Sequence, residues 1–317
     1  MTGCNGGDGS ERGGAKPAAF SGEYPMRIVA TTGMVADIAR QVAGEKGTVA
    51  ALMGPGSDPH VHKPTRDDVQ ALTNADVIFY SGLNLEGRMG DTFARFGRTG
   101  KPVYAVTEKL DESKLREPPE FDGHYDPHVW MDVKLWSECA GFVAEALAEF
   151  DPPNAERYRR NAADYRAELD QLDAYVKEAI ASVPEEHRVL VTSHDAFGYL
   201  GRAYGIEVNA VQGITTEAEA GLADVNELVG FIIQRKVPAI FVESSVSPKN
   251  IEHVRQACRA GGWEVRLGGE LFSDAMGAEG TYEGTYIGMI DHNATTVARA
   301  LGGTAPARGM QGKLAPR

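Results

Sequence analysis

The chain has 317 residues, of which 42% are hydrophobic and 24% charged, and its formal net charge is −13. This length allows two domains with cores of their own, and the composition is typical of a globular protein. The acidic balance and the lack of any basic run argue against nucleic-acid binding, which needs clustered Lys and Arg. No stretch holds the roughly 20 apolar residues of a transmembrane helix.

The first 25 residues are rich in Gly, Ser and charge, so we expect a disordered tether at 1–25. Its "TGC" followed by polar residues resembles the end of a bacterial lipoprotein signal, in which a small residue precedes a lipidated Cys, although the apolar region is missing. We therefore expect Met1 to stand where a signal peptide was removed and Cys4 to be a membrane attachment point. An incidental Cys in a disordered start is the alternative. Cys139 and Cys258 lie in helical patterns and are expected to be buried, and three cysteines imply no disulfide framework.

Short apolar runs alternate with helical patterns along the rest of the chain. The runs that predict strands lie at 26–33, 48–53, 76–82, 102–107, 188–194, 207–212, 238–245 and 264–271. A helix is expected at 66–75, with Thr65 as its N-cap and acidic residues in its first turn. This rhythm predicts an α/β fold of two lobes, each with a parallel sheet of about four strands flanked by helices.

Residues 153–183 predict one long helix, because apolar residues recur there at helical spacing between Pro152-Pro153 and Pro184. Such a helix between two α/β halves would act as a rigid spine. We therefore divide the chain as follows: a disordered tether at 1–25, an N-terminal α/β lobe at 26–152, the connecting long helix at 153–184, a C-terminal α/β lobe at 185–302 and a flexible tail at 303–317.

Four polar side chains are expected in a cleft between the lobes, because ligands of open α/β sheets bind beyond the carboxyl ends of the strands. His60 follows the run 48–53, and His194 ends the run 188–194. Asp274 follows the run 264–271, and His128 lies in a loop just ahead of a helix. Each has a simpler explanation when taken alone, such as a capping or core role for His194 and an N-cap role for Asp274.

The pattern Asp-Pro-His occurs twice, in "SDPHVHKP" around His60 and in "YDPHVWMD" around His128. The Pro restricts the backbone one residue before the His, and the Asp can orient it. Turn chemistry with an incidental His is the alternative. Among the other histidines, His62 and His124 are expected to be solvent-facing neighbours of better candidates, and His292 a helix residue with a local partner.

Several motifs, in the right order, make residues 26–302 resemble a known family, the metal-binding solute receptors (cluster A-I) of bacterial ABC importers for zinc and manganese. The segments are "GPGSDPHVHKPTRDDVQALTNADVIFYSGLNLEG", "YDPHVWMDV", "VTSHDAFGYLGRAYGI", "QGITTEAEAG", "FVESS", "GGELFSDAMG" and "TYIGMIDHNATTVARAL". The resemblance implies one metal ion between two lobes joined by a rigid helix. Its ligands would map onto His60, His128, His194 and Asp274.

The resemblance also implies a receptor, not an enzyme, that lies outside the cytoplasm, works as a monomer and hands its ion to an ABC permease. Three imidazoles and a carboxylate favour Zn²⁺ over Mn²⁺, which prefers more oxygen. Zinc-specific relatives often carry a long His-rich loop before the second ligand, and manganese-specific ones a carboxylate at the position of His194. This chain has neither, so both ions remain candidates.

Two other functions fit parts of the pattern. A zinc hydrolase would use the three histidines and keep an open position for water, but the chain lacks HExxH and any G-x-S-x-G elbow. Asp274 separates the two classes, since a fourth ligand closes the site. An adhesion or structural lipoprotein that only keeps the fold would bind no metal tightly. For the receptor, we expect release through modest loop or lobe shifts that expose His60 or Asp274.

Overall fold

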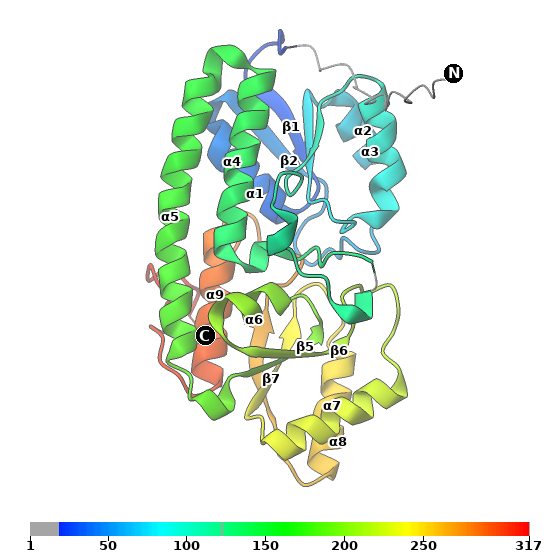
Figure 1. Cartoon of the computed structure of the whole chain (residues 1–317), viewed down its shortest axis with the longest axis vertical. Helices are drawn as coiled ribbons and strands as arrows, with labels where there is room; N and C mark the ends of the chain where they lie inside the picture. The colour runs from blue at the N-terminus through cyan, green and yellow to red at the C-terminus, as the bar shows by residue number, and fades with distance from the viewer. Residues whose placement is uncertain (1–18, 122, 317) are drawn as a thin grey trace, which may run out of the picture.

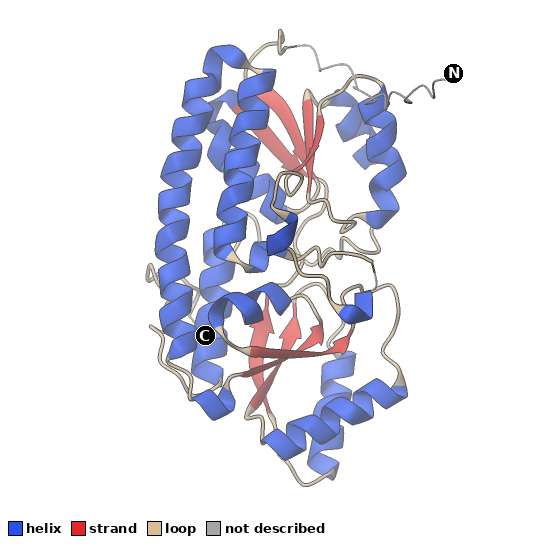
Figure 2. Cartoon of the chain, viewed as in Figure 1, coloured by secondary structure: helices blue, strands red, loops and turns tan. Residues whose placement is uncertain are grey.

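The computed structural model describes residues 19–121 and 123–316, so Cys4 and most of the expected tether lie outside the described residues. Two α/β lobes are stacked along the long axis of the molecule, with long helices along one side (Figures 1 and 2). Within the described residues, no helix combines the length and the apolar character needed to cross a membrane.

The N-terminal lobe is built on a four-stranded parallel sheet in the order β2-β1-β3-β4. Its elements are β1 (Met26–Ala30), α1 (Gly33–Ala43), β2 (Gly47–Ala51), α2 (Arg66–Asn74), β3 (Val77–Tyr80), α3 (Gly90–Arg98), β4 (Val103–Ala105) and α4 (Val133–Phe150). Helix α2 begins as predicted: the Thr65 hydroxyl accepts the Asp68 N–H, and the Asp68 carboxylate accepts the Thr65 N–H. This capping box fixes the end of the loop that carries His60.

The C-terminal lobe also has four parallel strands, hydrogen-bonded in two pairs, β5-β6 and β7-β8. Its elements are β5 (Val189–His194), α6 (Gly198–Tyr204), β6 (Glu207–Gln212), α7 (Leu222–Arg235), β7 (Ala239–Glu243), α8 (Lys249–Ala260), β8 (Arg266–Leu271) and α9 (Tyr286–Ala300). Strand β5 lies beside β7 (Figure 1), so the ends of these two buried strands meet at the top of the lobe. The predicted two-lobe α/β fold is confirmed.

The predicted long helix is α5 (Ala155–Ala181), preceded by a 3-10 turn at Pro152–Asn154. It runs along both lobes (Figure 1) and packs against α1 and α4 of the first lobe and α9 of the second. Its buried face includes Tyr158, Ala162, Tyr165, Leu169, Leu172 and Val176. Because one hydrophobic cluster contains this face and residues of both lobes, a wide hinge motion would expose apolar core to water.

The last described residues, 303–316, differ from the flexible tail that their composition predicts. They contain no regular element, yet Leu314 is only 3% exposed. The Met310 N–H donates to Asp291, and the Ala315 N–H to Glu283, at 2.9 and 2.8 Å. Residues 303–316 are held by the burial of a few apolar side chains and by hydrogen bonds to two acidic residues outside the segment. The composition of the segment alone does not reveal these partners.

Candidate metal centre

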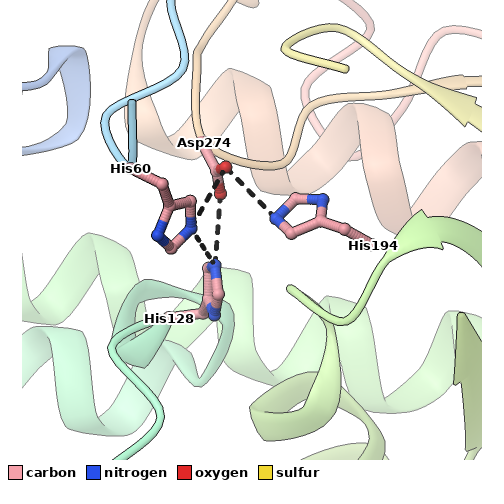
Figure 3. Close-up of side chains that lie close together, drawn as sticks. All are labelled: His60, His128, His194 and Asp274. Atoms are coloured by element: carbon pink, nitrogen blue, oxygen red, sulfur yellow. Dashed lines mark hydrogen bonds and ion pairs between the residues drawn. The ribbon is translucent and has the colours of Figure 1, made fainter. Parts of the chain in front are cut away.

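The structure brings the four predicted site residues together between the lobes (Figure 3). One potential ligand atom from each residue lies within 4.8 Å of the other three. The residues are His60, His128, His194 and Asp274. His60 comes from the loop after β2 and His128 from the loop before α4, while His194 ends β5 and Asp274 follows β8. Both lobes therefore contribute, as the positions at strand ends predict.

Asp274 lies at the middle of this cluster (Figure 3). Its Oδ2 is 3.2 Å from Nε2 of His194 and 3.7 Å from Nε2 of His60. Its Oδ1 is 3.4 Å from Nε2 of His128. The Nε2 atoms of His60 and His128 are 3.3 Å apart. All three imidazoles thus present the same ring nitrogen to one carboxylate.

The cluster is buried and incompletely hydrogen-bonded. His60 is 5% exposed, Asp274 2%, and His128 and His194 0%. Among the described residues, both carboxylate oxygens of Asp274 and Nε2 of His194 lack a hydrogen-bond partner. Buried polar atoms without partners are unfavourable and rare. A cation among these atoms would satisfy them, so the donor set fits a metal ion.

The aspartates of both Asp-Pro-His motifs orient their histidines, as predicted. Asp58 Oδ1 accepts the backbone N–H of His60 at 2.9 Å, and Asp126 Oδ1 accepts that of His128 at 2.9 Å. Asp126 Oδ1 also lies 2.8 Å from Nδ1 of the His128 ring. Since a carboxylate only accepts, Nδ1 carries the proton, which leaves the Nε2 lone pair for an ion.

Glu243 does the same for His194 and was not identified from the sequence. It lies at the end of β7, and its carboxylate accepts from the His194 backbone N–H at 2.8 Å and from ring Nδ1 at 2.5 Å. The available signal was an acidic residue ending the buried apolar run 238–243. That signal becomes meaningful only once β5 and β7 are known to lie side by side.

Charge interactions within the cluster move the pKa values apart. Burial alone would raise the pKa of Asp274, but the charges of His194 and His128 hold it well below its usual range. Burial alone would lower the pKa of His128, yet the hydrogen bond to Asp126 and the negative charge of Asp274 raise it to about 9. Likewise, the charges of Glu243 and Asp274 outweigh burial and raise the pKa of His194. Burial dominates at His60 and lowers its pKa to about 3.

These shifts describe a protonated, metal-free site. The raised pKa values of His128 and His194 favour protonated rings, and the lowered pKa of Asp274 favours its negative form, so these charges offset one another. Metal ligands must be deprotonated, so an ion that binds here takes the place of these protons.

Five histidines lie outside this cluster of ligand atoms, among them His62, His124 and His292. His62 is half-buried and its Nε2 is 3.1 Å from Oδ2 of Asp68, so it is not the solvent-facing residue that we expected. His124 is exposed, as predicted, and lies against the ring of Phe121. His292 is a helix residue, as predicted, but its partner is not local: Nε2 lies 2.9 Å from the backbone carbonyl of Glu270 in β8.

Two α/β lobes joined by a long helix, with three imidazoles and a carboxylate buried between them, define the class of two-lobed binding proteins with a site of metal-ligand chemistry. The sequence agrees with this class. Residues 28–300 match the family described as the periplasmic component A of the zinc-uptake complex, and the chain belongs to that family. The resemblance found in the motifs is therefore confirmed.

Individual relatives extend over almost the whole chain. The chain is 48% identical to the zinc-binding protein TroA of Treponema pallidum over 288 residues, which cover 91% of this chain and 92% of TroA. It is 41% identical over 302 residues to the manganese-binding lipoprotein MntA of Bacillus subtilis, with 95% of each covered. The solved structure of periplasmic TroA from T. pallidum superimposes with a TM-score of 0.84 at 47% identity, covering 90% of this chain and 99% of that one.

Proposed function

We propose that the protein is an extracytoplasmic receptor that captures one Zn²⁺ or Mn²⁺ ion and delivers it to an ABC permease. The proposed ligands are Nε2 of His60, His128 and His194 and the carboxylate of Asp274. The observation that carries the proposal is the set of buried atoms without partners, Asp274 Oδ1 and Oδ2 and His194 Nε2, inside a cluster of ligand atoms. Membership of a zinc-uptake family supports it.

Zinc is the ion that the ligands favour. Three nitrogens and one oxygen suit four-coordinate Zn²⁺, and the affinity of such sites rises from manganese to zinc. The relatives point both ways, since TroA is named for zinc and MntA for manganese. We therefore expect both ions to bind, with zinc the tighter.

A carrier fits the site better than a hydrolase. Catalytic zinc keeps a position open for water beside three protein ligands. Here Asp274 reaches the same point as the three histidines and is 2% exposed. The proposed fourth ligand would therefore leave no position for a reacting water.

We also propose a lipid anchor at Cys4, which lies outside the described residues, and a monomeric receptor at the membrane surface. The relative MntA is a lipoprotein, which supports the anchor. Mass spectrometry of the protein purified from membranes would detect a diacylglyceryl group on Cys4. A free thiol there would contradict the anchor and leave the receptor proposal intact.

The experiment that tests the receptor is calorimetric titration of chelator-stripped protein with zinc and manganese separately. His60→Ala and Asp274→Ala are compared with the wild type, and His253→Ala, an exposed histidine on α8, is the matched control. We expect one ion per chain, tight for zinc, unchanged in the control and lost or badly weakened in the other two variants. Absence of saturable binding would overturn the proposal. Zinc binding that survives Asp274→Ala unchanged would favour the three-histidine catalytic site.

A further inference from the structure

A cavity of about 500 Å³ opens onto the metal-ligand cluster from one side. Its lining includes His60 from the cluster, Arg88 of the N-terminal lobe, and Thr215 and Glu217 of the C-terminal lobe. A second cavity, of about 390 Å³, has Asp274 in its lining and involves none of residues 215–217. An ion that leaves past His60 would therefore pass residues 215–217, whereas one that leaves past Asp274 would not.

Residues 215–217, which we call the latch, reach from the C-terminal lobe to the N-terminal lobe. They belong to the segment between β6 and α7, on the side of the molecule opposite α5 (Figure 1). The Thr216 hydroxyl donates to Asp58 Oδ2 at 2.6 Å. Arg88 Nε donates to Glu217 Oε1 at 2.8 Å. The lobes are thus joined by α5 on one side and by these polar contacts on the other.

The latch is connected to His60 through Asp58. One oxygen of Asp58 accepts the Thr216 hydroxyl, and the other accepts the backbone N–H of His60. Loss of the Thr216 contact would free the Asp58 carboxylate, and with it the turn that presents His60. Because the core shared along α5 resists a wide hinge motion, a local opening at this side costs less than separation of the lobes.

We propose that Thr216 and Glu217 are positioning residues that hold the His60 turn closed over the site and set the rate of metal release. The inference rests on the proposed function, because it concerns the departure of the captured ion. Thr216 has the larger role, since it donates to a carboxylate, and such charge-assisted hydrogen bonds are about twice as strong as neutral ones. The Arg88–Glu217 pair has the smaller one, because its side chains are 39% and 49% exposed and water screens them.

The test measures zinc release from loaded full-length protein after mixing with an excess of a fluorescent chelator. Thr216→Val removes the hydroxyl and keeps the shape, and Glu217→Gln removes the charge. We expect release about tenfold faster in Thr216→Val, the factor that one charge-assisted hydrogen bond supplies, and about twofold faster in Glu217→Gln. Thr216→Ser, which restores the hydroxyl, should release zinc at the wild-type rate.

A control variant separates the effect of the latch from a nonspecific effect of breaking an ion pair. Glu207→Gln breaks an ion pair of similar exposure, Arg235–Glu207 at 3.2 Å with both side chains 44% exposed, inside one lobe. It should leave the release rate unchanged. Thermal unfolding of each metal-free variant is recorded beside the release rate. A lower melting temperature with an unchanged release rate would mean that Thr216 has a merely structural role, whereas faster release in Thr216→Val that Thr216→Ser reverses supports the latch.

The possible failures are distinguishable because zinc stoichiometry is measured on the same samples. One zinc per chain with wild-type release rates in both Thr216→Val and Glu217→Gln would overturn the latch and keep the receptor. That result would direct release through the cavity at Asp274. A wild-type protein that takes up no zinc would overturn both. If Thr216→Val does not fold, the exposed Glu217→Gln still decides, through a rate that rises or stays constant.

Discussion

Glu243 accepts two hydrogen bonds from His194, one from the backbone N–H and one from ring Nδ1, at 2.8 and 2.5 Å. One carboxylate thereby fixes both the position of the residue and the tautomer of its ring, with Nε2 aimed at the cluster. The end of β7 thus controls a proposed ligand at the end of β5.

Glu243→Gln is therefore expected to weaken zinc binding although Glu243 does not face the ion. The amide can accept one of the two hydrogen bonds but carries no charge to support the ring proton. Loss of such an orienting partner lowers metal affinity by about 10–100-fold, and we expect the lower end. Calorimetry with a competing chelator measures the change. Glu252→Gln, in a partly exposed pair with Arg255 of the same lobe, is the control. Equal affinity in both variants would contradict the role of Glu243.

Asp274→Asn keeps the shape of the central carboxylate and removes its charge. We expect zinc affinity to fall about 100-fold or more, because removing one partner of a buried charged pair costs about 3–5 kcal/mol and each 1.4 kcal/mol is a factor of ten. The measurement is the zinc dissociation constant from chelator competition. A loss of less than threefold would mean that the histidines hold the ion without the carboxylate.

The two left-handed helix C-caps of the C-terminal lobe give a test of the fold that is independent of metal. Helix α7 ends at Lys236 with φ 50°, and α6 ends at Gly205 with φ 73°. A side chain in this conformation costs about 1–2 kcal/mol, whereas Gly adds about 0.5–1 kcal/mol of backbone entropy to the unfolded state. Lys236→Gly should therefore raise the free energy of unfolding by about 0.5–1 kcal/mol.

The reverse substitution, Gly205→Ala, should lower the free energy of unfolding by about 1 kcal/mol. A Cβ at Gly205 would have no atom within 4 Å, so the effect isolates backbone conformation from packing. Urea denaturation of the metal-free protein measures both changes, and zinc affinity should stay constant in both. Stabilisation by Gly205→Ala would mean that α6 does not end in the left-handed conformation.

The sequence predicted those features that depend on local pattern. The cap at Thr65, the ends of the strands and the Asp-Pro-His turns follow from neighbouring residues. Three of the four clustered residues follow from the rule that sites form at strand ends, and His128 follows from its Asp-Pro-His motif. Contacts between distant residues were not predictable in the same way. Glu243 meets His194 from 49 positions away and Thr216 meets Asp58 from 158. Both depend on which strands and loops become neighbours, which no local period encodes.

Zinc binding should release protons, and its affinity should increase with pH through neutrality, with the contribution of His128 ending near pH 9. The sign follows from the raised pKa of His128, about 9, and the raised pKa of His194: both rings are protonated at neutral pH in the metal-free protein, and the ion must displace those protons. His60, with a pKa lowered to about 3, gives up none. If the imidazoles had unperturbed pKa values, zinc affinity would no longer depend on pH above about pH 6.5.

The dependence amounts to about tenfold in affinity per pH unit for each proton displaced. Calorimetry at pH 7.5 in buffers of different ionisation enthalpy counts the protons directly. We expect the wild type to release between one and two protons per zinc. His128→Ala should release fewer, because its site has lost one of the two imidazoles with a raised pKa. Zinc binding without proton release at pH 7.5 would mean that the rings are neutral before the ion arrives, and that Asp274 is not balanced by their charge.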